Sequence, residues 1–419
     1  MNISLSRVML RFSTDDVIFG ILLFLVFCLP ISEAGKNIAA LLLLVFKVFS
    51  YLVRKSYNYQ FYFVDFLLLL FFLMAALSVI FSYPYPNAWR ELKDVFMYLS
   101  LAWVIIHSIF SKKQIIILLI VLLVSTVFGM LDGLWKWKVT HEKIFFELHS
   151  VGFTTQTAIY MAIISCWSLV FSFVLWFKKS FPLALLVSVS AAFSVFVLLI
   201  GESRGAVLAF FTGSIFGMFW IYRKFLHTVK ARVMTLFALI ALITVPFLFN
   251  PYIIDKTVSK FQAGGITSIS SGRDLIANVS LAAFNEYLWL GVGAGNHGKI
   301  TEDDVKSWFI ISGREYIESD YIYKYHPHNL FLGTMAERGL LGFIALLGLL
   351  IFWGWVVFRF SPESDSNQDY WGAWILSISA LSVVIVAGLF NTTLHHEHGQ
   401  LAMLGFGVFF SILKRDGVI

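Results

Sequence analysis

Charged side chains are scarce in this chain. Only 13% of its 419 residues are Asp, Glu, Lys or Arg, whereas 59% are hydrophobic and 44 are Phe. A soluble domain carries about 25% charged residues, so this composition excludes an ordinary water-soluble fold and places most of the chain in lipid. At roughly 20 residues for each spanning helix, a dozen helices would use a little over half of the length. The remainder must form loops, and at least one of them is long.

Cysteine is almost absent. Cys28 and Cys166 both sit inside apolar runs, so we expect two buried thiols rather than a disulfide. No spacing typical of a zinc site occurs, and there is no internal repeat. The residues after the first apolar run, 31–33, lack a small-residue cleavage pattern. We therefore expect that run to be an uncleaved first span rather than a signal peptide.

Long apolar runs are what the chain has instead. They predict an all-α polytopic membrane protein with about twelve transmembrane helices, at about 15–31, 36–53, 62–81, 91–110, 115–134, 154–176, 182–200, 205–221, 232–249, 329–357, 370–393 and 399–413. The pattern divides the chain into three parts: nine spans in 1–249, a long loop in 250–328, and three spans in 329–419.

Basic residues fall on every second connector. They are Arg7 and Arg11, Arg54 and Lys55, Lys112 and Lys113, Lys178 and Lys179, Arg223 to Arg232, Arg359, and Lys414 and Arg415. By the positive-inside rule this side is cytoplasmic, and both termini lie there. The loop 250–328, of about 80 residues, is then periplasmic and too long to be a passive connection. The periplasm offers no ATP and the chain has no P-loop, so a transfer reaction there must use an already activated substrate.

The long loop contains a predicted amphipathic helix at 273–290. Ser271 and Asp274 resemble a capping box, which places the start of the helix near Gly272. The glycine run 291–295 ends the helix, and we interpret it as a flexible turn because no strand precedes it as in a dinucleotide fingerprint. The apolar residues that recur at helical spacing are Ile276, Val279, Ala283, Tyr287 and Leu290.

Two arginines are candidate anion ligands. Arg204 lies in a short connector on the side that should be poor in Arg, where it either snorkels as an interfacial anchor or binds an anion. Arg273 lies in the first turn of the predicted loop helix. There its guanidinium and the helix amides would both favour phosphate, although a solvated surface role is the alternative.

Histidines supply the candidate proton carriers and metal ligands. His328 has three possible roles, as a structural residue, a metal ligand or a proton carrier, and its neighbours Pro327 and Asn329 favour a shaped turn over core packing. His395, His396 and His398 with Glu397 form the one cluster that resembles a metal site. Only 395 and 398 fit one helix face, and the cluster occupies a tight connector, so we expect no metal site.

Separated blocks of this sequence resemble the O-antigen ligase and polymerase superfamily. The blocks are Ser203-Arg204-Gly205, Ser271-Gly272-Arg273 followed by the glycine run, and His328-Asn329 followed by Gly339-Leu340-Leu341-Gly342, with a weaker block from Gly152 through Gln156 to Tyr160. The match covers the second half of the chain, whereas the first five spans match only in hydropathy.

The resemblance implies an α-helical glycosyltransferase of the GT-C type in the bacterial inner membrane, with its active site facing the periplasm. It implies that Arg204 and Arg273 bind the diphosphate of an undecaprenyl-linked O-antigen donor, and that His328 activates a hydroxyl of lipid A–core. The residues expected to support them are Ser203, Gly205, Asn329, Gly339, Gly342 and Gln156. The partners would be these substrates and membrane lipids, with no cofactor, metal or nucleic acid.

Two alternatives stay open at this point. An O-antigen polymerase shares the superfamily motifs but uses a second lipid-linked glycan as its acceptor. A polytopic lipid or sugar transporter fits the hydropathy, but it would place charged residues near the middle of the bilayer and show paired halves. The candidate residues here cluster at one face instead, and the long loop breaks any such symmetry.

Overall fold

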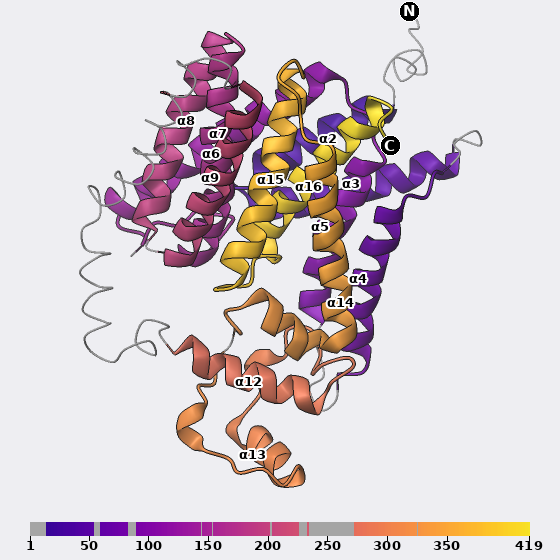
Figure 1. The fold of residues 1–419 in the computed structure, drawn as a ribbon, viewed down its shortest axis with the longest axis vertical. Coiled ribbons are helices and arrows are strands. Elements are labelled where there is room, and N and C mark those ends of the chain that lie inside the picture. The colour runs from indigo at the N-terminus through magenta and orange to yellow at the C-terminus, as the bar shows by residue number, and fades with distance from the viewer. Residues whose placement is uncertain are drawn as a thin grey trace, which may run out of the picture.

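The computed structural model describes residues 14–53, 59–82, 89–143, 145–152, 154–201, 203–225, 233, 272–324 and 326–419 (Figure 1). The predicted span 232–249 lies outside the described residues apart from position 233, and so do Ser271 and the basic residues at 7, 11, 54 and 55.

The described part of the chain is helical and contains no β-strand. This confirms the predicted all-α fold. The membrane bundle is built from α2 (Thr14–Cys28), α3 (Glu33–Val53), α4 (Phe63–Ile80), α5 (Trp89–Ile106), α6 (Lys112–Lys138), α7 (Thr154–Phe177), α8 (Phe181–Ile200), α9 (Arg204–Phe225), α14 (Leu330–Arg359), α15 (Gln368–Gly388) and α16 (His396–Arg415). Two further helices, α12 (Arg273–Glu286) and α13 (Glu302–Ile311), belong to the long loop.

Eight of the bundle helices are long and apolar enough to cross a membrane: α3, α4, α6, α7, α8, α9, α14 and α15. The other three depart from that pattern for separate reasons. α2 has only 15 residues, and α5 and α16 begin with charged and imidazole side chains. The multi-pass membrane character is therefore confirmed, whereas the count of twelve spans stays a prediction.

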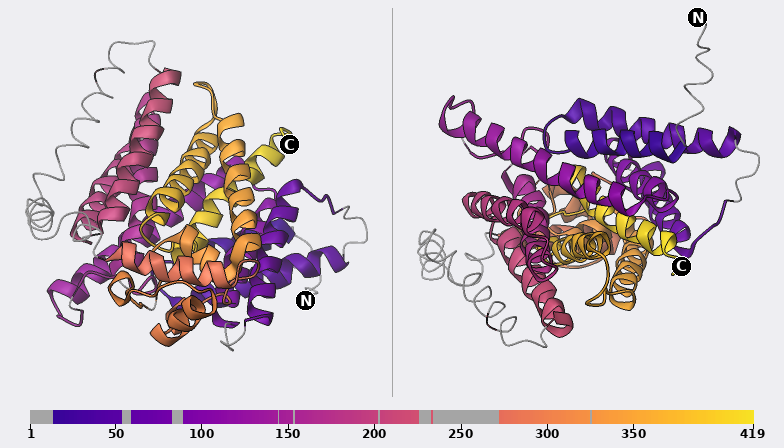
Figure 2. Two further views of the ribbon diagram at one scale, coloured as in Figure 1. Left: turned by 60° about the horizontal axis from the view of Figure 1, so that its bottom comes forward. Right: turned by 90° about the horizontal axis from the view of Figure 1, so that it is seen from above.

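Two inner helices of the bundle are α7 and α15. They are the most buried of the candidate spans, at 89% and 83%, and α15 packs against α6, α7, α9, α14 and α16 (Figure 2). Gly372 permits the close approach of α15 to α6 and α7, because a β-carbon there would lie 2.6 Å from Leu119 of α6 and 2.9 Å from Phe171 of α7. The indole of Trp167 donates to the Gly372 carbonyl at 2.9 Å. The indole nitrogen of Trp167 is thus satisfied inside the bundle, where no water is at hand to replace the partner.

Basic connectors gather at one end of the bundle, which we call the basic end. There Lys178 donates to the Ser364 carbonyl at 2.7 Å, and Lys224 pairs with Glu363 at 2.5 Å. Arg415 reaches the α15 residue Asp369. Residues 272–324 lie at the opposite end, which we call the loop end (Figure 1). Among the described residues, the basic connectors at Lys178, Lys224 and Arg415 therefore lie at the same end of the fold, as the alternation predicts.

The loop forms a small unit with its own apolar core. α12 begins at Arg273 behind Gly272, as expected, but it ends at Glu286 rather than near residue 290. The core joins the predicted apolar face of α12 to α13, through Val279, Ala282, Ala283, Val292, Ile300, Val305, Trp308 and Ala336. Burial of this face explains why a short polar helix is stable outside the membrane.

The glycine run 291–295 is a packed joint, and the expectation of a flexible turn is wrong. α14 breaks at Gly339, whose φ of 63° and ψ of −166° are non-helical. A β-carbon there would lie 2.3 Å from the Trp289 carbonyl carbon, and one on Gly291 would lie 2.4 Å from that of Glu337. The backbone amide of Val292 donates to the Ala336 carbonyl at 2.9 Å. Backbone therefore packs directly on backbone where the loop meets α14.

Candidate active site

The His-Pro-His-Asn turn is held from both sides. Pro327 packs on Gly333, where a β-carbon would lie 2.6 Å from the proline ring. Asn329 is the N-cap of α14, and its side-chain oxygen accepts from the amides of Phe331 and Leu332 at 2.9 Å each. His328 between them has a φ of +49°, which is uncommon for a residue with a side chain. The turn therefore fixes the direction of the His328 imidazole.

His328 is half-buried and has one polar side-chain neighbour across the bundle. Its Nδ1 lies 3.5 Å from the side-chain oxygen of the buried Asn391. Burial lowers the pKa of His328, and the positive charges of Arg273 and Lys324 lower it further, while the hydrogen bond to Asn391 raises it. With Nδ1–H donating to Asn391, the neutral ring keeps its lone pair on Nε2. The ring is then suited to accept a proton.

Arg273 and Arg204 lie within electrostatic range of each other. Burial lowers the pKa of Arg273, and the charge of Arg204 lowers it further. Each is the first residue of its helix, α12 and α9 respectively. The site therefore brings together two half-buried guanidiniums and two helix N-termini, and all four favour an anion. Because Arg273 also acts on His328, the three predicted residues share one region of the loop end.

The connector 389–395, between α15 and α16, holds this region together. Gly205 of α9 packs on Phe390, since a β-carbon there would lie 2.9 Å from that side chain. Asn329 donates to the Leu389 carbonyl at 3.1 Å, and Asn391 contacts His328. The start of α9 and the His328 turn therefore dock on the same short segment. The predicted span 370–393 is corrected here, because α15 ends at Gly388 and leaves Asn391 in the connector.

The predicted supporting residues have local structural roles. Ser203 accepts the amide of Val207 on its carbonyl at 3.0 Å and so begins α9. Gly342 lies close to Arg338 one turn earlier, because a β-carbon on Gly342 would lie 2.3 Å from that of Arg338. The side-chain oxygen of Gln156 lies 3.2 Å from the β-carbon position of Gly152. Within the described residues, Gln156 has no hydrogen bond to either site arginine or to His328.

His326 faces a different group from His328. Its ring lies 6.4 Å from that of His395, measured between centroids, and both line a small cavity with Glu91, Glu337 and Arg338. His326 and His328 therefore have different side-chain neighbours, although they are only two residues apart.

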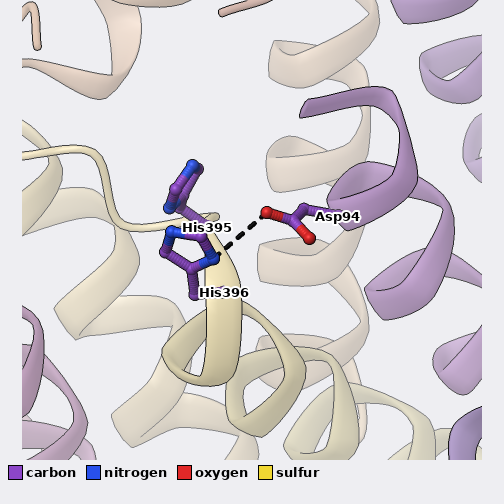
Figure 3. A group of neighbouring side chains, drawn as sticks. All are labelled: Asp94, His395 and His396. Atoms are coloured by element: carbon purple, nitrogen blue, oxygen red, sulfur yellow. Dashed lines mark ion pairs between the residues drawn. The ribbon is translucent and has the colours of Figure 1, made fainter. Parts of the chain in front are cut away.

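The histidines at the start of α16 have separate partners. His395 contacts Glu91 at 2.7 Å and His396 contacts Asp94 at 3.1 Å, as Figure 3 shows for His396. His398 is buried and its Nε2 lies 3.1 Å from the Thr392 carbonyl. His395 and His398, the two that fit one helix face, therefore have different partners, and α5 supplies those of His395 and His396.

Sequence reasoning missed His297, which supports the segment before the turn. Its Nε2 lies 3.0 Å from the Ser280 hydroxyl and its Nδ1 lies 3.3 Å from the Lys324 carbonyl. Burial lowers the pKa of His297 to about 4, so the ring is neutral at pH 7. A lone histidine after a glycine run gives no sequence signal for this role.

The fold and this region define the class of the protein. It is a multi-pass helical membrane protein whose polar, anion-favouring site lies at the loop end of the bundle. Residues 189–347 match a family model described as O-antigen ligase, and this segment contains both arginines and the His328 turn. This segment of the chain is therefore similar to the O-antigen ligase family. A comparison with curated proteins gives no match.

Proposed function

We propose that the protein is an O-antigen ligase of the bacterial inner membrane. It transfers O-antigen polysaccharide from undecaprenyl diphosphate to a hydroxyl of lipid A–core, at the periplasmic face. The observation that carries the proposal is the proximity of three groups: the charge of Arg204 acts on Arg273, and the charge of Arg273 acts on His328. Two cations beside a neutral imidazole are what such a transfer requires, and the family match gives the substrate class.

The donor brings its own activation, because its anomeric carbon is bonded to diphosphate. Arg204 and Arg273 bind that diphosphate and offset the negative charge that builds on it as the bond between carbon and oxygen breaks. Guanidinium is suited to this role because its planar fork matches phosphate oxygens in pairs. The two helix N-termini add backbone amides to the same region.

His328 acts as the general base. Its Nε2 takes the proton of the acceptor hydroxyl while the hydroxyl oxygen attacks the anomeric carbon, and undecaprenyl diphosphate leaves with the bonding electron pair. Such base catalysis contributes about 10²–10⁴-fold. A single displacement inverts the anomeric configuration, and no step requires a metal or cofactor. The lowered pKa keeps His328 unprotonated at pH 7.

The topology follows from the charge of the connectors. The basic end faces the cytoplasm and carries both termini, and the loop end, with residues 250–328, faces the periplasm. We also propose that the fold is of the GT-C type. It divides into nine spans in 1–249, the loop in 250–328 and three spans in 329–419.

One assay tests the function. Purified protein is mixed with lipid-linked donor and offered either lipid A–core or a second lipid-linked glycan, and the products are identified by mass spectrometry. Ligase activity gives glycan on lipid A–core alone. Elongated lipid-linked glycan, with unmodified lipid A–core, would identify a polymerase, which uses the same chemistry on a different acceptor. Absence of both products would refute the proposal.

A further inference from the structure

Four side chains outside the proposed catalytic region meet at the loop end. Glu91 and Asp94 lie one turn apart near the start of α5, and His395 and His396 lie about 300 residues later at the start of α16. One ligand atom from each of Asp94, His395 and His396 lies within 4.8 Å of the others. Figure 3 shows the two imidazoles beside the Asp94 carboxylate.

The contacts within this group leave polar atoms incompletely satisfied. Asp94 Oδ2 lies 3.1 Å from His396 Nδ1, yet this buried oxygen makes no hydrogen bond with suitable geometry in the described part of the chain. His395 is held more directly, with its Nε2 2.7 Å from a Glu91 oxygen. A buried carboxylate oxygen without a directed partner is costly. The arrangement therefore favours a bound group that accepts electron pairs from a carboxylate oxygen and from imidazole nitrogens at the same time.

Protonation of the histidines cannot balance the charge of this group. The rings of His395 and His396 are 3.6 Å apart between centroids, so two imidazolium ions there would repel each other strongly. Lys93 approaches the other Asp94 oxygen at 3.5 Å, but its side chain is 59% exposed and contributes little. Two carboxylates thus face at most one imidazolium, and a divalent cation bound to neutral rings would offset both.

We propose that Asp94, His395 and His396 bind one divalent cation of the zinc class, and that Glu91 orients His395 for it. Imidazole nitrogen with carboxylate oxygen is a ligand set suited to zinc and similar transition metals rather than to magnesium or calcium. A carboxylate on the second nitrogen of a ligating histidine is the common supporting contact. His396 also has a φ of +44°, a conformation that the ligand role would explain.

The cation joins the start of α5 to the start of α16. These helices pack against each other along the bundle, and Glu91 and His395 form one side of the cavity that His326 lines. The cation stabilises this wall and takes no part in the transfer, because its ligands are distinct from His328 and the two site arginines. The inference is therefore independent of the proposed function, and it is tested without donor or acceptor.

The experiment measures zinc binding to the full-length protein, purified in detergent with a tag that contains no histidine. After treatment with chelator and its removal, calorimetric titration with Zn²⁺ and elemental analysis should give one zinc per chain, not displaced by excess Mg²⁺. His396→Gln and Asp94→Asn should each weaken binding at least tenfold. His149→Gln, at an exposed histidine elsewhere in the chain, is the matched control and should bind as the wild type does.

A second variant keeps the test informative if a ligand variant fails to fold. Glu91→Gln leaves all three ligands in place and should weaken zinc binding by about 10–100-fold, the usual effect of losing a supporting contact. Co²⁺ in place of Zn²⁺ should give visible absorption bands that His396→Gln alters. Substoichiometric zinc in the wild type, or unchanged affinity in the folded variants, would overturn the proposal.

Discussion

Removal of the His328 imidazole should stop glycan transfer without unfolding the protein. The general-base contribution of about 10²–10⁴-fold corresponds to about 2.7–5.4 kcal/mol of transition-state stabilisation. The structural loss is smaller, because the side chain makes one long hydrogen bond, to Asn391, worth about 0.5–1.5 kcal/mol. His328→Asn is the better variant than His328→Ala, since Asn tolerates the positive φ at this position.

The assay is single-turnover transfer from lipid-linked donor, with thermal unfolding and donor binding measured on the same preparations. We expect Tm and donor affinity near wild-type values and a rate reduced at least 100-fold. His326→Ala is the matched control, because its ring faces His395 rather than the arginines, and it should lose less than tenfold. Transfer by folded His328→Asn at close to the normal rate would refute the base role.

The pH dependence gives a second measure of the same reasoning. A base must be unprotonated, so the rate should fall as pH drops through the His328 pKa, which burial and Arg273 hold below the ordinary 6.5. Arg273→Ala removes a positive charge and should move this acid limb to higher pH. Asn391→Ala removes the contact that raises the pKa and should move the limb to lower pH. Shifts in the opposite directions would assign the limb to another group.

Four further outcomes are expected. Arg204→Lys and Arg273→Lys should each lower the transfer rate substantially, because Lys keeps the charge but loses the planar fork; wild-type rates in both would contradict diphosphate binding. The transfer rate per folded molecule should be unchanged in excess chelator, and a loss of that rate restored by added metal would place a metal in the reaction. Alkaline phosphatase fused within α13 should be active and fused between α7 and α8 inactive, whereas the reverse would invert the topology. Gly339→Ala should lower Tm strongly, because its φ is positive and the Trp289 backbone blocks a β-carbon, whereas Gly348→Ala in the same helix should be nearly neutral.

Local patterns predicted the elements of the site well. The polar turn before an apolar run gave the start of α14 at the residue after Asn329, and the glycine before Arg273 marked the start of α12. Each signal acts within a few residues, through backbone conformation or capping, and so it can be read in the sequence. The alternation of basic connectors is equally local, and the structure places Lys178, Lys224 and Arg415 at one end.

The partners that arrive from distant segments could not be predicted. Asn391 follows Leu389 and Phe390, which prolong the apolar run of α15, so the sequence placed it inside a span. Glu91 and Asp94 were assigned to another span, and only tertiary packing brings them to residues 395 and 396. The break at Gly339 depends likewise on the backbone of residues 288–290, which approaches from the loop.

The backbone packing at Gly291 and Gly339 determines where a chimaera of two related chains can have its crossover points. Each glycine faces backbone atoms of the other segment. A substitution can shorten a side chain but cannot remove backbone atoms, so no substitution in one segment makes space for a larger residue in the other. Residues 287–295 and 330–341 thus pack as one unit, and neither segment can be replaced without the other. A loop exchanged between relatives should fold only when both halves come from the same parent, whereas crossovers within α13 leave the joint intact. The loop unit can then be exchanged at its outer surface while its joint to α14 stays the same.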